Sequence, residues 1–190
     1  MAYLREADLR AVGARETLIV KSAGRDILRE SLAAKNNFDI FLSHAMVDRD
    51  LVRGAVEVLR NVGLTAYVDW LVDPQLNRAD VTQKTADTLR SRMKQCKMLF
   101  YLWSESASDS RWMPWELGYF DALKRHVAIV PIVKTSDASF KGTEFVGLYP
   151  TVDFPQIGSK FLPKINGVDP VSWTRGQATI DRLIGMRLRD

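Results

Sequence analysis

Four short apolar segments alternate with stretches of helical spacing, and this alternation is the feature that most constrains the fold. The segments are FDIFLSHA (38–45), LTAYVDW (64–70), MLFYLW (98–103) and HVAIVPIV (126–133). Between them, apolar residues recur on one helical face, for example from about Asp48 to Asn61. The third segment is apolar throughout, which favours a central strand buried on both faces. Strands and helices in alternation predict a parallel sheet covered on both sides.

We therefore expect an α/β fold, a flavodoxin-like doubly wound parallel sheet of five strands in the order 2-1-3-4-5, with helices on both faces. TVDF (151–154) is the expected fifth strand, and the apolar spacing from Val171 to Leu188 predicts a closing helix. Residues 1–35 read as an N-terminal helical extension, and residues 36–190 as one domain that includes the closing helix.

Composition narrows the class of protein. The 190 residues are 46% hydrophobic and 26% charged, which is typical of a globular chain. The single cysteine, Cys96, excludes an internal disulfide framework and fits a reducing cytosol, and we expect a packed, inert thiol. The net charge of +4 is modest, so we expect a solvated basic surface and neither a nucleic acid nor a membrane partner. Without a bilayer-spanning apolar run or a signal peptide pattern, we expect a cytoplasmic location.

The strand order predicts where a ligand binds. In an open doubly wound sheet, ligands bind beyond the carboxyl ends of the strands, where the strand order reverses. Here the reversal falls between the first and third strands. The chain leaves the first strand through Ser43, His44 and Ala45, and the second through Asp69. The helix that follows the third strand should border the same crevice.

That helix carries RWMPWELGYF (111–120), in which Trp112 and Glu116 are four residues apart and share a helical face. Pro114 suits the first turn of a helix, so Glu116 should lie in that turn, where the helix dipole keeps a carboxylate ionised. Two interpretations remain open at this point. Glu116 is either an ordinary acidic residue at a helix start or a catalytic carboxylate, and His44 and Asp69 equally suit capping or turn roles.

Other chemistries have less support in the sequence. No GxxxxGK[ST] motif or glycine fingerprint follows the first strand, and no G-x-S-x-G elbow is present. The two histidines, His44 and His126, have no cysteine or histidine at zinc spacing, so we expect no metal. A reaction led by a carboxylate remains.

Taken together, FDIFLSHA, GLTAYVDW and WMPWELGYF, in this order before HVAIVPIV, resemble the TIR (Toll/interleukin-1 receptor) family over residues 36–135. Several branches of this family cleave NAD with a glutamate in a W-x-x-x-E pattern, which Trp112 to Glu116 fill without a gap. The resemblance therefore implies that Glu116 is catalytic. It also implies a set of substrate-binding residues, to which we add Asp69 because of its place at the end of the second strand. The full set is Phe41, Ser43, His44, Ala45, Asp69 and Trp112.

The resemblance implies an NAD nucleosidase or ADP-ribosyl cyclase for which NAD is a substrate and no cofactor is needed. Its product would be ADP-ribose or a cyclic ADP-ribose isomer. In bacterial stand-alone relatives of the Thoeris type, such a product acts as an antiphage signal for a separate effector. The family also self-associates, and we expect a homo-oligomer with contacts through residues 71–81, the BB loop.

Two alternatives stay open. Many TIR domains are scaffolds that only bind other TIR domains, and others act as effectors on a host cell. The BB loop also departs from the family pattern, because Asn77 to Val81 replace the glycine that commonly precedes its helix.

Overall fold

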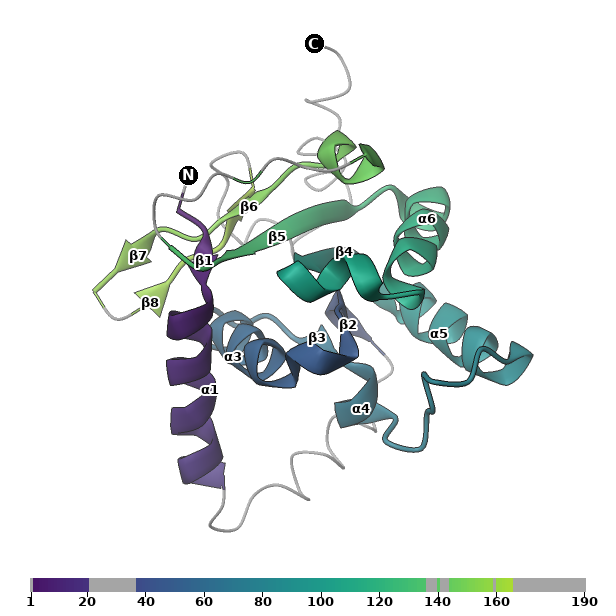
Figure 1. Cartoon of the computed structure of the whole chain (residues 1–190), viewed down its shortest axis with the longest axis horizontal. Coiled ribbons are helices and arrows are strands. Elements are labelled where there is room, and N and C mark those ends of the chain that lie inside the picture. The colour runs from purple at the N-terminus through teal and green to yellow at the C-terminus, as the bar shows by residue number, and fades with distance from the viewer. Residues whose placement is uncertain (1, 21–36, 136–139, 141–143, 159, 166–190) are drawn as a thin grey trace.

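The structure is a computed structural model that describes residues 2–20, 37–135, 140, 144–158 and 160–165 (Figure 1). The strands are β1 (Leu4–Arg5), β2 (Phe38–Ser43), β3 (Ala66–Tyr67), β4 (Cys96–Trp103), β5 (Val127–Val133), β6 (Val152–Asp153), β7 (Gln156–Ile157), β8 (Lys160–Phe161) and β9 (Lys164–Ile165). The helices are α1 (Glu6–Val20), α3 (Arg49–Arg60), α4 (Asp69–Val72), α5 (Gln83–Gln95) and α6 (Trp112–Lys124), with short 3-10 helices η1 (Met46–Asp48), η2 (Glu105–Asp109) and η3 (Glu144–Leu148).

Five parallel strands form the main sheet in the order β1-β5-β4-β2-β3. The α/β class and the parallel sheet are confirmed, and β3-β2-β4-β5 stand in the order expected for the first four strands. The strand in the fifth position of the sheet is β1, and not the expected strand at 151–154. Leu4 and Arg5 pair there with Ile132 and Val133. The expected strand at 151–154 contributes an isolated parallel bridge from Thr151 to Ile129, and β6 pairs antiparallel with β9 in a small separate sheet.

The N-terminal segment thus starts with a strand of the main sheet and continues as α1, which packs along α3 (Figure 1). Leu9 on α1 is fully buried. The backbones approach so closely that a Cβ added at Gly54 would lie 2.1 Å from the carbonyl oxygen of Leu9. The domain boundary at residue 35 stays a prediction because residues 21–36 lie outside the described residues. The helix expected from Val171 to Leu188 lies outside them too.

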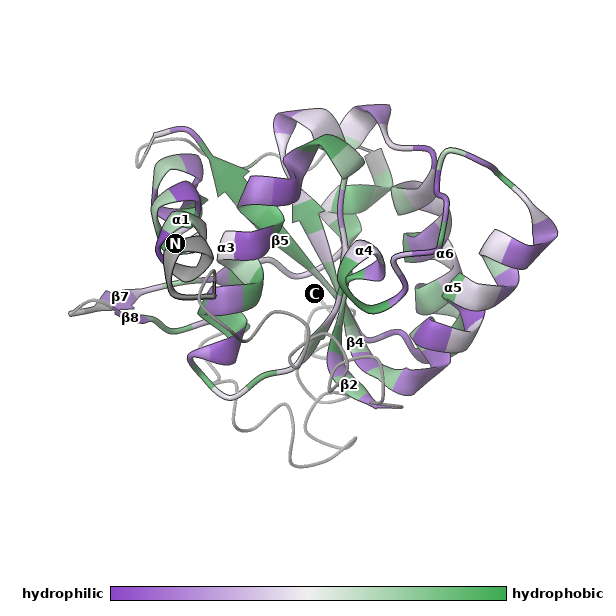
Figure 2. Cartoon of the chain, turned by 90° about the horizontal axis from the view of Figure 1, so that it is seen from below, coloured by the Kyte–Doolittle hydropathy of each residue, from purple (hydrophilic) through white to green (hydrophobic). Residues whose placement is uncertain are grey.

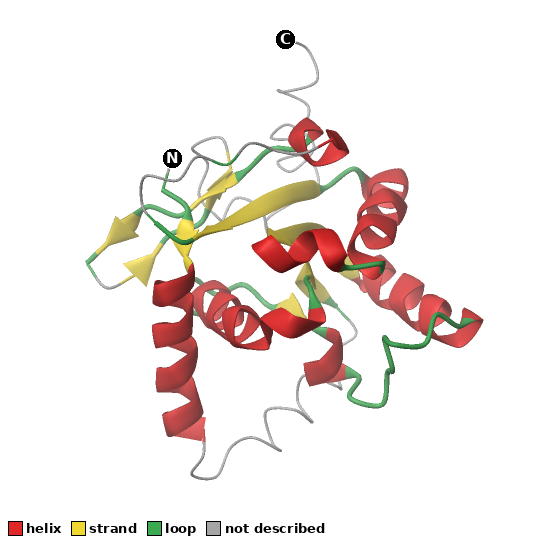
Figure 3. Ribbon diagram, viewed as in Figure 1, coloured by secondary structure: helices red, strands yellow, loops and turns green. Residues whose placement is uncertain are grey.

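Side chains alternate between the two faces of the sheet with a period of two residues, as strand geometry requires. On β4, Phe100 and Leu102 join a core under α1 and α3, while Leu99 and Tyr101 join a second core under α5 and α6. Figure 3 shows the strands of the main sheet between helices, and in Figure 2 the strands are mostly hydrophobic whereas the helices carry many hydrophilic residues. Ser43 follows Phe41 by two residues on β2 and therefore faces α6.

The structure bears on the expectations for Cys96 and for membrane-spanning segments. Cys96 is buried in the second core, and burial raises the pKa of its thiol well above the ordinary value, which suits an inert side chain. Among the described residues, no helix combines the length and the apolar character that crossing a bilayer requires.

Candidate active site

Glu116 is a residue of α6 and lies at the carboxyl edge of the sheet, next to β2. It is fully buried, with 0% of its surface exposed. The Ser43 hydroxyl donates a hydrogen bond of 2.6 Å to Oε2 of Glu116. This contact joins the end of the first predicted strand to the W-x-x-x-E helix, 73 residues further along the chain. The crevice expected at the reversal of strand order therefore brings Ser43 and Glu116 together.

A second partner of Glu116 comes from the loop of residues 71–81. Arg78 donates from Nη2 to Oε1 of Glu116 over 2.5 Å and from Nη1 to Oδ2 of Asp69 over 2.9 Å. The side chains of Arg78 and Asp69 are each 3% exposed. One buried cation is thus shared by two buried carboxylates, which is an arrangement that needs good geometry to offset the loss of hydration.

Asp69 is the first residue of α4 and is held on both sides. Its Oδ1 accepts a hydrogen bond from the backbone N–H of Trp70 at 2.7 Å, while Oδ2 accepts from Arg78. The local turn contact considered from the sequence is therefore present. In addition, Asp69 fixes one edge of the Arg78 guanidinium, so it positions the cation that contacts Glu116.

His44 is fully buried beside this cluster, and its hydrogen bonds define its tautomer. Its Nδ1 lies 2.9 Å from the carbonyl oxygen of Leu42, and the indole Nε1 of Trp70 donates to its Nε2 at 3.0 Å. Nδ1 must therefore carry the proton and Nε2 must accept. Burial, and also the positive charge of Arg78, lower the pKa of His44, although Asp69 and Asp48 oppose this shift. The ring is neutral in this arrangement.

Trp112 and Glu116 share a helical face, as their spacing predicted, and both contact Arg78. The indole Nε1 of Trp112 donates a hydrogen bond of 2.7 Å to the backbone oxygen of Arg78. The tryptophan of the W-x-x-x-E pattern thus holds the main chain of loop 71–81, and its glutamate holds the side chain. Trp115 and Tyr119 are half-buried and stack on each other, with ring centroids 5.7 Å apart.

Phe41 and Ala45 are also buried, but they contribute apolar packing. The Phe41 ring stacks on Tyr67 with centroids 5.2 Å apart, and both belong to the core under α5 and α6. Ala45 belongs to the same core. These two residues are thus part of the apolar core, and their substrate-binding role stays a prediction.

Glu116 lies further inside its helix than expected from the sequence, so the helix dipole does not keep it ionised. Helix α6 begins at Trp112, two residues before Pro114, and its first turn contains no acidic residue. Glu116 lies one full turn inside the helix, where the dipole effect has faded. Burial raises the pKa of the Glu116 carboxyl, and the Arg78 charge and the Ser43 hydroxyl only partly oppose this shift. Arg78 and Ser43, and not the helix start, are what favour the carboxylate.

Sequence reasoning missed Arg78 as a site residue, although it noted the unusual loop around it. From Pro74 to Lys84, Arg78 is the single buried residue. It also missed Asp48, a buried carboxylate at the end of η1 that accepts a hydrogen bond from Ser104 beyond β4. Ser104 leaves the third predicted strand, so this bond crosses the same point of strand reversal. Asp48 is one of the acidic residues that follow FDIFLSHA at the start of the next helix, and this acidic helix start was the sequence signal that could have identified it.

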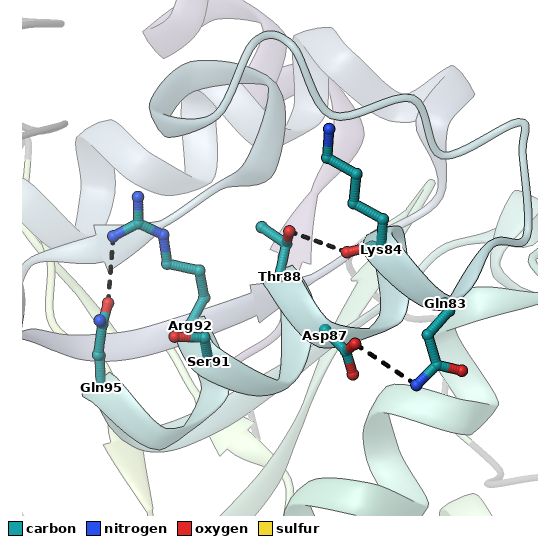
Figure 4. Close-up of a pocket in the computed structure, with 7 residues that line it drawn as sticks. All are labelled: Gln83, Lys84, Asp87, Thr88, Ser91, Arg92 and Gln95. Atoms are coloured by element: carbon teal, nitrogen blue, oxygen red, sulfur yellow. Dashed lines mark hydrogen bonds between the residues drawn. The ribbon is translucent and has the colours of Figure 1, made fainter.

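The site is closed in this structure, because Glu116, Ser43, His44, Asp69 and Arg78 are all buried. A shallow hollow lies elsewhere, along one side of α5 between Gln83 and Gln95 (Figure 4). Its lining consists of polar side chains of a single helix, so it provides no access to Glu116. Within the described ranges no three His, Cys, Asp or Glu side chains are grouped as a metal ion would require, and the absence of a metal stays a prediction.

Comparison with known families identifies the fold and the segments around this site. The family model described as "TIR domain" matches residues 40–159. The chain belongs to the TIR family. The match contains residues 40–43 of β2, loop 71–81 and the W-x-x-x-E helix, so all parts of the buried cluster fall within the TIR domain.

Two curated bacterial relatives share part of this domain. The chain is 49% identical over 116 residues to "Probable 3' cyclic ADP-D-ribose synthase ThsB'" of Bacillus cereus (strain MSX-D12), which covers 60% of each protein. It is 27% identical over 86 residues to "Putative cyclic ADP-D-ribose synthase TIR2" of Cytobacillus dafuensis, covering 45% of this chain and 23% of that protein. The chain thus spans less than two thirds of the length of either relative.

Proposed function

We propose that this TIR protein cleaves the bond between nicotinamide and ribose in NAD and forms a cyclic ADP-ribose isomer. The observation that carries the proposal is the W-x-x-x-E glutamate, Glu116, buried at the strand reversal with Ser43 and Arg78 on its two oxygens. The names of the two bacterial relatives, both cyclic ADP-D-ribose synthases, support the same class of reaction.

One carboxylate is sufficient for this bond cleavage. When the glycosidic bond breaks, its electron pair leaves with the pyridinium nitrogen, so nicotinamide departs as a neutral molecule and needs no general acid. Positive charge develops on the ribose, as in glycoside hydrolysis. The tasks that remain are to hold the ribose hydroxyls and to stabilise this charge, and a fixed carboxylate in a dry site can do both. Glu116 is the residue proposed for this role.

The product depends on what attacks the ribose carbon. Attack by a nitrogen or hydroxyl of the same molecule forms a ring, and the attacking group then loses any proton it carried. Water would instead give ADP-ribose. A buried site disfavours water, which supports cyclisation, and the Bacillus cereus relative is named for the 3' isomer. We take a cyclic isomer as the main product and hydrolysis as the side reaction.

The biological role follows from this product as part of the proposal. A cyclic nucleotide made from NAD suits a signal to a separate effector in bacterial antiphage defence. Self-association through loop 71–81 and a cytoplasmic location belong to the same proposal. Loop 71–81 contacts Glu116 directly through Arg78, which supports a link between assembly and access to the site.

The test is incubation of the purified protein with NAD, with nicotinamide release followed by chromatography and the nucleotide product identified by mass spectrometry. The wild type should release nicotinamide and form a cyclic product. Glu116→Gln should reduce the rate by at least about 100-fold, because removing one preorganised electrostatic contact in a dry site commonly has an effect of this size.

The matched control is Glu6→Gln on α1, where the carboxylate makes a long, partly exposed pair with Arg10 and lies outside the buried cluster. Its rate should equal that of the wild type. Absence of nicotinamide release from the wild type at high protein concentration, with or without an assembly partner, would favour the scaffold interpretation. Equal rates for Glu116→Gln and the wild type would remove Glu116 from the mechanism.

A further inference from the structure

Loop 71–81 has an unusual attachment to the rest of the domain. Its neighbours Asn77 and Ala79 are exposed, and between residues 74 and 81 Arg78 is the only buried residue. In the described part of the chain, Arg78 is the only lysine or arginine that is buried. The other charged groups in the cluster, including Asp69 and Glu116, are carboxylates, so among the described residues Arg78 is the only buried cation that can bind an anion there.

The hydrogen bonds of Arg78 leave part of its guanidinium unused. Nη1 is occupied by Asp69, and Nη2 by one oxygen of Glu116. The Nε–H is buried and has no hydrogen-bond partner among the described residues. Leaving a buried donor unpaired costs about 1–3 kcal/mol, so a buried arginine normally uses this group.

The unpaired Nε–H lies on the same edge of the planar guanidinium as Nη2. Such an edge matches two oxygens of one carboxylate or phosphate. Glu116 offers only Oε1 to it, because Oε2 accepts from Ser43. The edge is therefore half-filled in the closed site, and a phosphate group could satisfy both donors.

We propose that Arg78 is a substrate-binding residue that exchanges Glu116 for the diphosphate of a dinucleotide. In the closed site, Nη2 of this edge contacts Glu116 and the Nε–H has no partner among the residues that the structure describes. When substrate enters, this edge binds a phosphate of the diphosphate, and the released Glu116 carboxylate becomes free for the ribose. Asp69 retains Nη1 in both states and limits how far the guanidinium moves. This inference rests on the proposed function, because the diphosphate is the anionic group of NAD.

The exchange explains why the loop carries a charged attachment at Arg78 in addition to the apolar packing of Val72 and Leu76. An apolar anchor would close the site equally well but could not be replaced by a dissolved anion. With Arg78 as the anchor, the diphosphate of the incoming ligand replaces Glu116 on the guanidinium and so releases the loop. The affinity of the ligand is then set partly by its diphosphate and partly by the cost of breaking the contact between Arg78 and Glu116.

The test measures binding by titration calorimetry with two probes that share a ribose. ADP-ribose carries the diphosphate, and nicotinamide riboside has no phosphate. Arg78→Gln should weaken ADP-ribose binding by at least about 10-fold, the equivalent of roughly 1.4 kcal/mol for losing charge-assisted hydrogen bonds. Nicotinamide riboside affinity should stay the same or rise, because its site is no longer closed by the cation.

Two further variants separate charge from folding. Arg78→Lys keeps the charge without the two-donor edge and should recover only part of the ADP-ribose affinity. Arg90→Gln removes a half-buried arginine that pairs with Asp87 and lies over the Trp115 ring, away from Arg78, and should change neither affinity. Circular dichroism and thermal unfolding establish that each variant is folded.

Equal loss of affinity for both probes in Arg78→Gln, or no loss for either, would overturn the inference. So would the absence of saturable ADP-ribose binding to the wild type. The result is distinguishable from failure of the proposed function. A protein that binds ADP-ribose through Arg78 yet releases no nicotinamide from NAD would keep this site and lose the activity.

Discussion

Helix α1 and loop 71–81 both lie outside the central strands, yet they are attached to the domain by opposite means. Helix α1 is held by apolar side chains such as Leu9 and by the close backbone approach at Gly54. Loop 71–81 is also anchored by apolar residues, because Val72 and Leu76 pack in the core under α5 and α6. Around Arg78, however, it is held by the contacts of that buried cation with Asp69 and Glu116 and by the hydrogen bond from Trp112 to its main chain. The attachment of α1 is thus mainly apolar, whereas that of the residues around Arg78 consists mainly of ionic hydrogen bonds.

The difference indicates which of the two elements can move during function. Apolar contact is non-directional and scales with buried area, so no dissolved ligand can replace it. An ionic contact can be exchanged for another ion, because the ligand supplies equivalent hydrogen bonds. We therefore expect α1 to be a permanent part of the domain and loop 71–81 to open and close.

The largest effect should come from breaking the apolar attachment. Leu9→Ala removes a fully buried side chain from the core under α1 and α3 and should lower the free energy of unfolding by about 2–5 kcal/mol. Denaturant unfolding measures this value. Leu148→Ala, at a residue that is 71% exposed, is the matched control and should change stability by less than about 0.5 kcal/mol. A similar small change for Leu9→Ala would mean that α1 is not anchored in this way.

Breaking the ionic attachment should cost less global stability. Arg78→Met leaves two buried carboxylates without their cation, which in a rigid site costs about 3–5 kcal/mol. If the loop opens and water reaches Asp69 and Glu116, the free energy of unfolding should fall by less than about 2 kcal/mol. Arg90→Met is the matched surface control. A loss for Arg78→Met as large as that for Leu9→Ala would contradict the contrast between the two regions.

The pH dependence of stability should report on the buried His44. Its pKa is lowered from 6.5 in the folded protein, so its contribution to stability is present above about pH 6.5 and is lost as the pH falls. Glu116 acts oppositely, because its pKa is raised from 4.5. Its contribution is present at low pH and is lost as the pH rises through the raised value.

His44→Gln isolates the first of these two contributions. Below pH 6.5, the free energy of unfolding of the wild type should fall relative to the variant by at most about 1.4 kcal/mol per pH unit. Urea unfolding of both proteins between pH 5 and 8 measures the difference. Parallel curves over this range would show that His44 is not buried in the neutral form.

The smallest effect should come from the tip of loop 71–81. Asn77 donates a hydrogen bond to Asp80 and accepts one from the N–H of Ala79, and all three residues are exposed. Asn77→Ala should therefore change the free energy of unfolding by no more than about 1 kcal/mol, and ADP-ribose affinity should stay close to that of the wild type. A large loss of affinity would show that the tip, and not Arg78 alone, sets the loop position.

The sequence was sufficient to predict the parts of this site that depend on periodicity. The apolar strands, their order, and the period-two spacing from Phe41 to Ser43 place the hydroxyl on the face where α6 packs. The spacing from Trp112 to Glu116 places both side chains on the side of α6 that contacts loop 71–81. These features follow from helix and strand geometry, which is regular and local.

The rest depends on packing that has no periodic pattern. Arg78 lies in an irregular loop, so its inward direction could not be read from spacing. The two-residue strand at Leu4 is too short to show alternation, and its place beside β5 is set by tertiary contacts. The ionisation of Glu116 was misjudged because the helix begins at Trp112 and because desolvation by the surrounding core exceeds the helix dipole effect.

A crystal structure of the wild-type protein with bound ADP-ribose would show whether Arg78 exchanges its partner. We expect the diphosphate on the Nε and Nη2 edge of Arg78, the contact between Asp69 and Nη1 retained, and the Glu116 carboxylate released toward the ribose. A structure in which ADP-ribose binds elsewhere, while Arg78 remains on Glu116, would contradict this exchange.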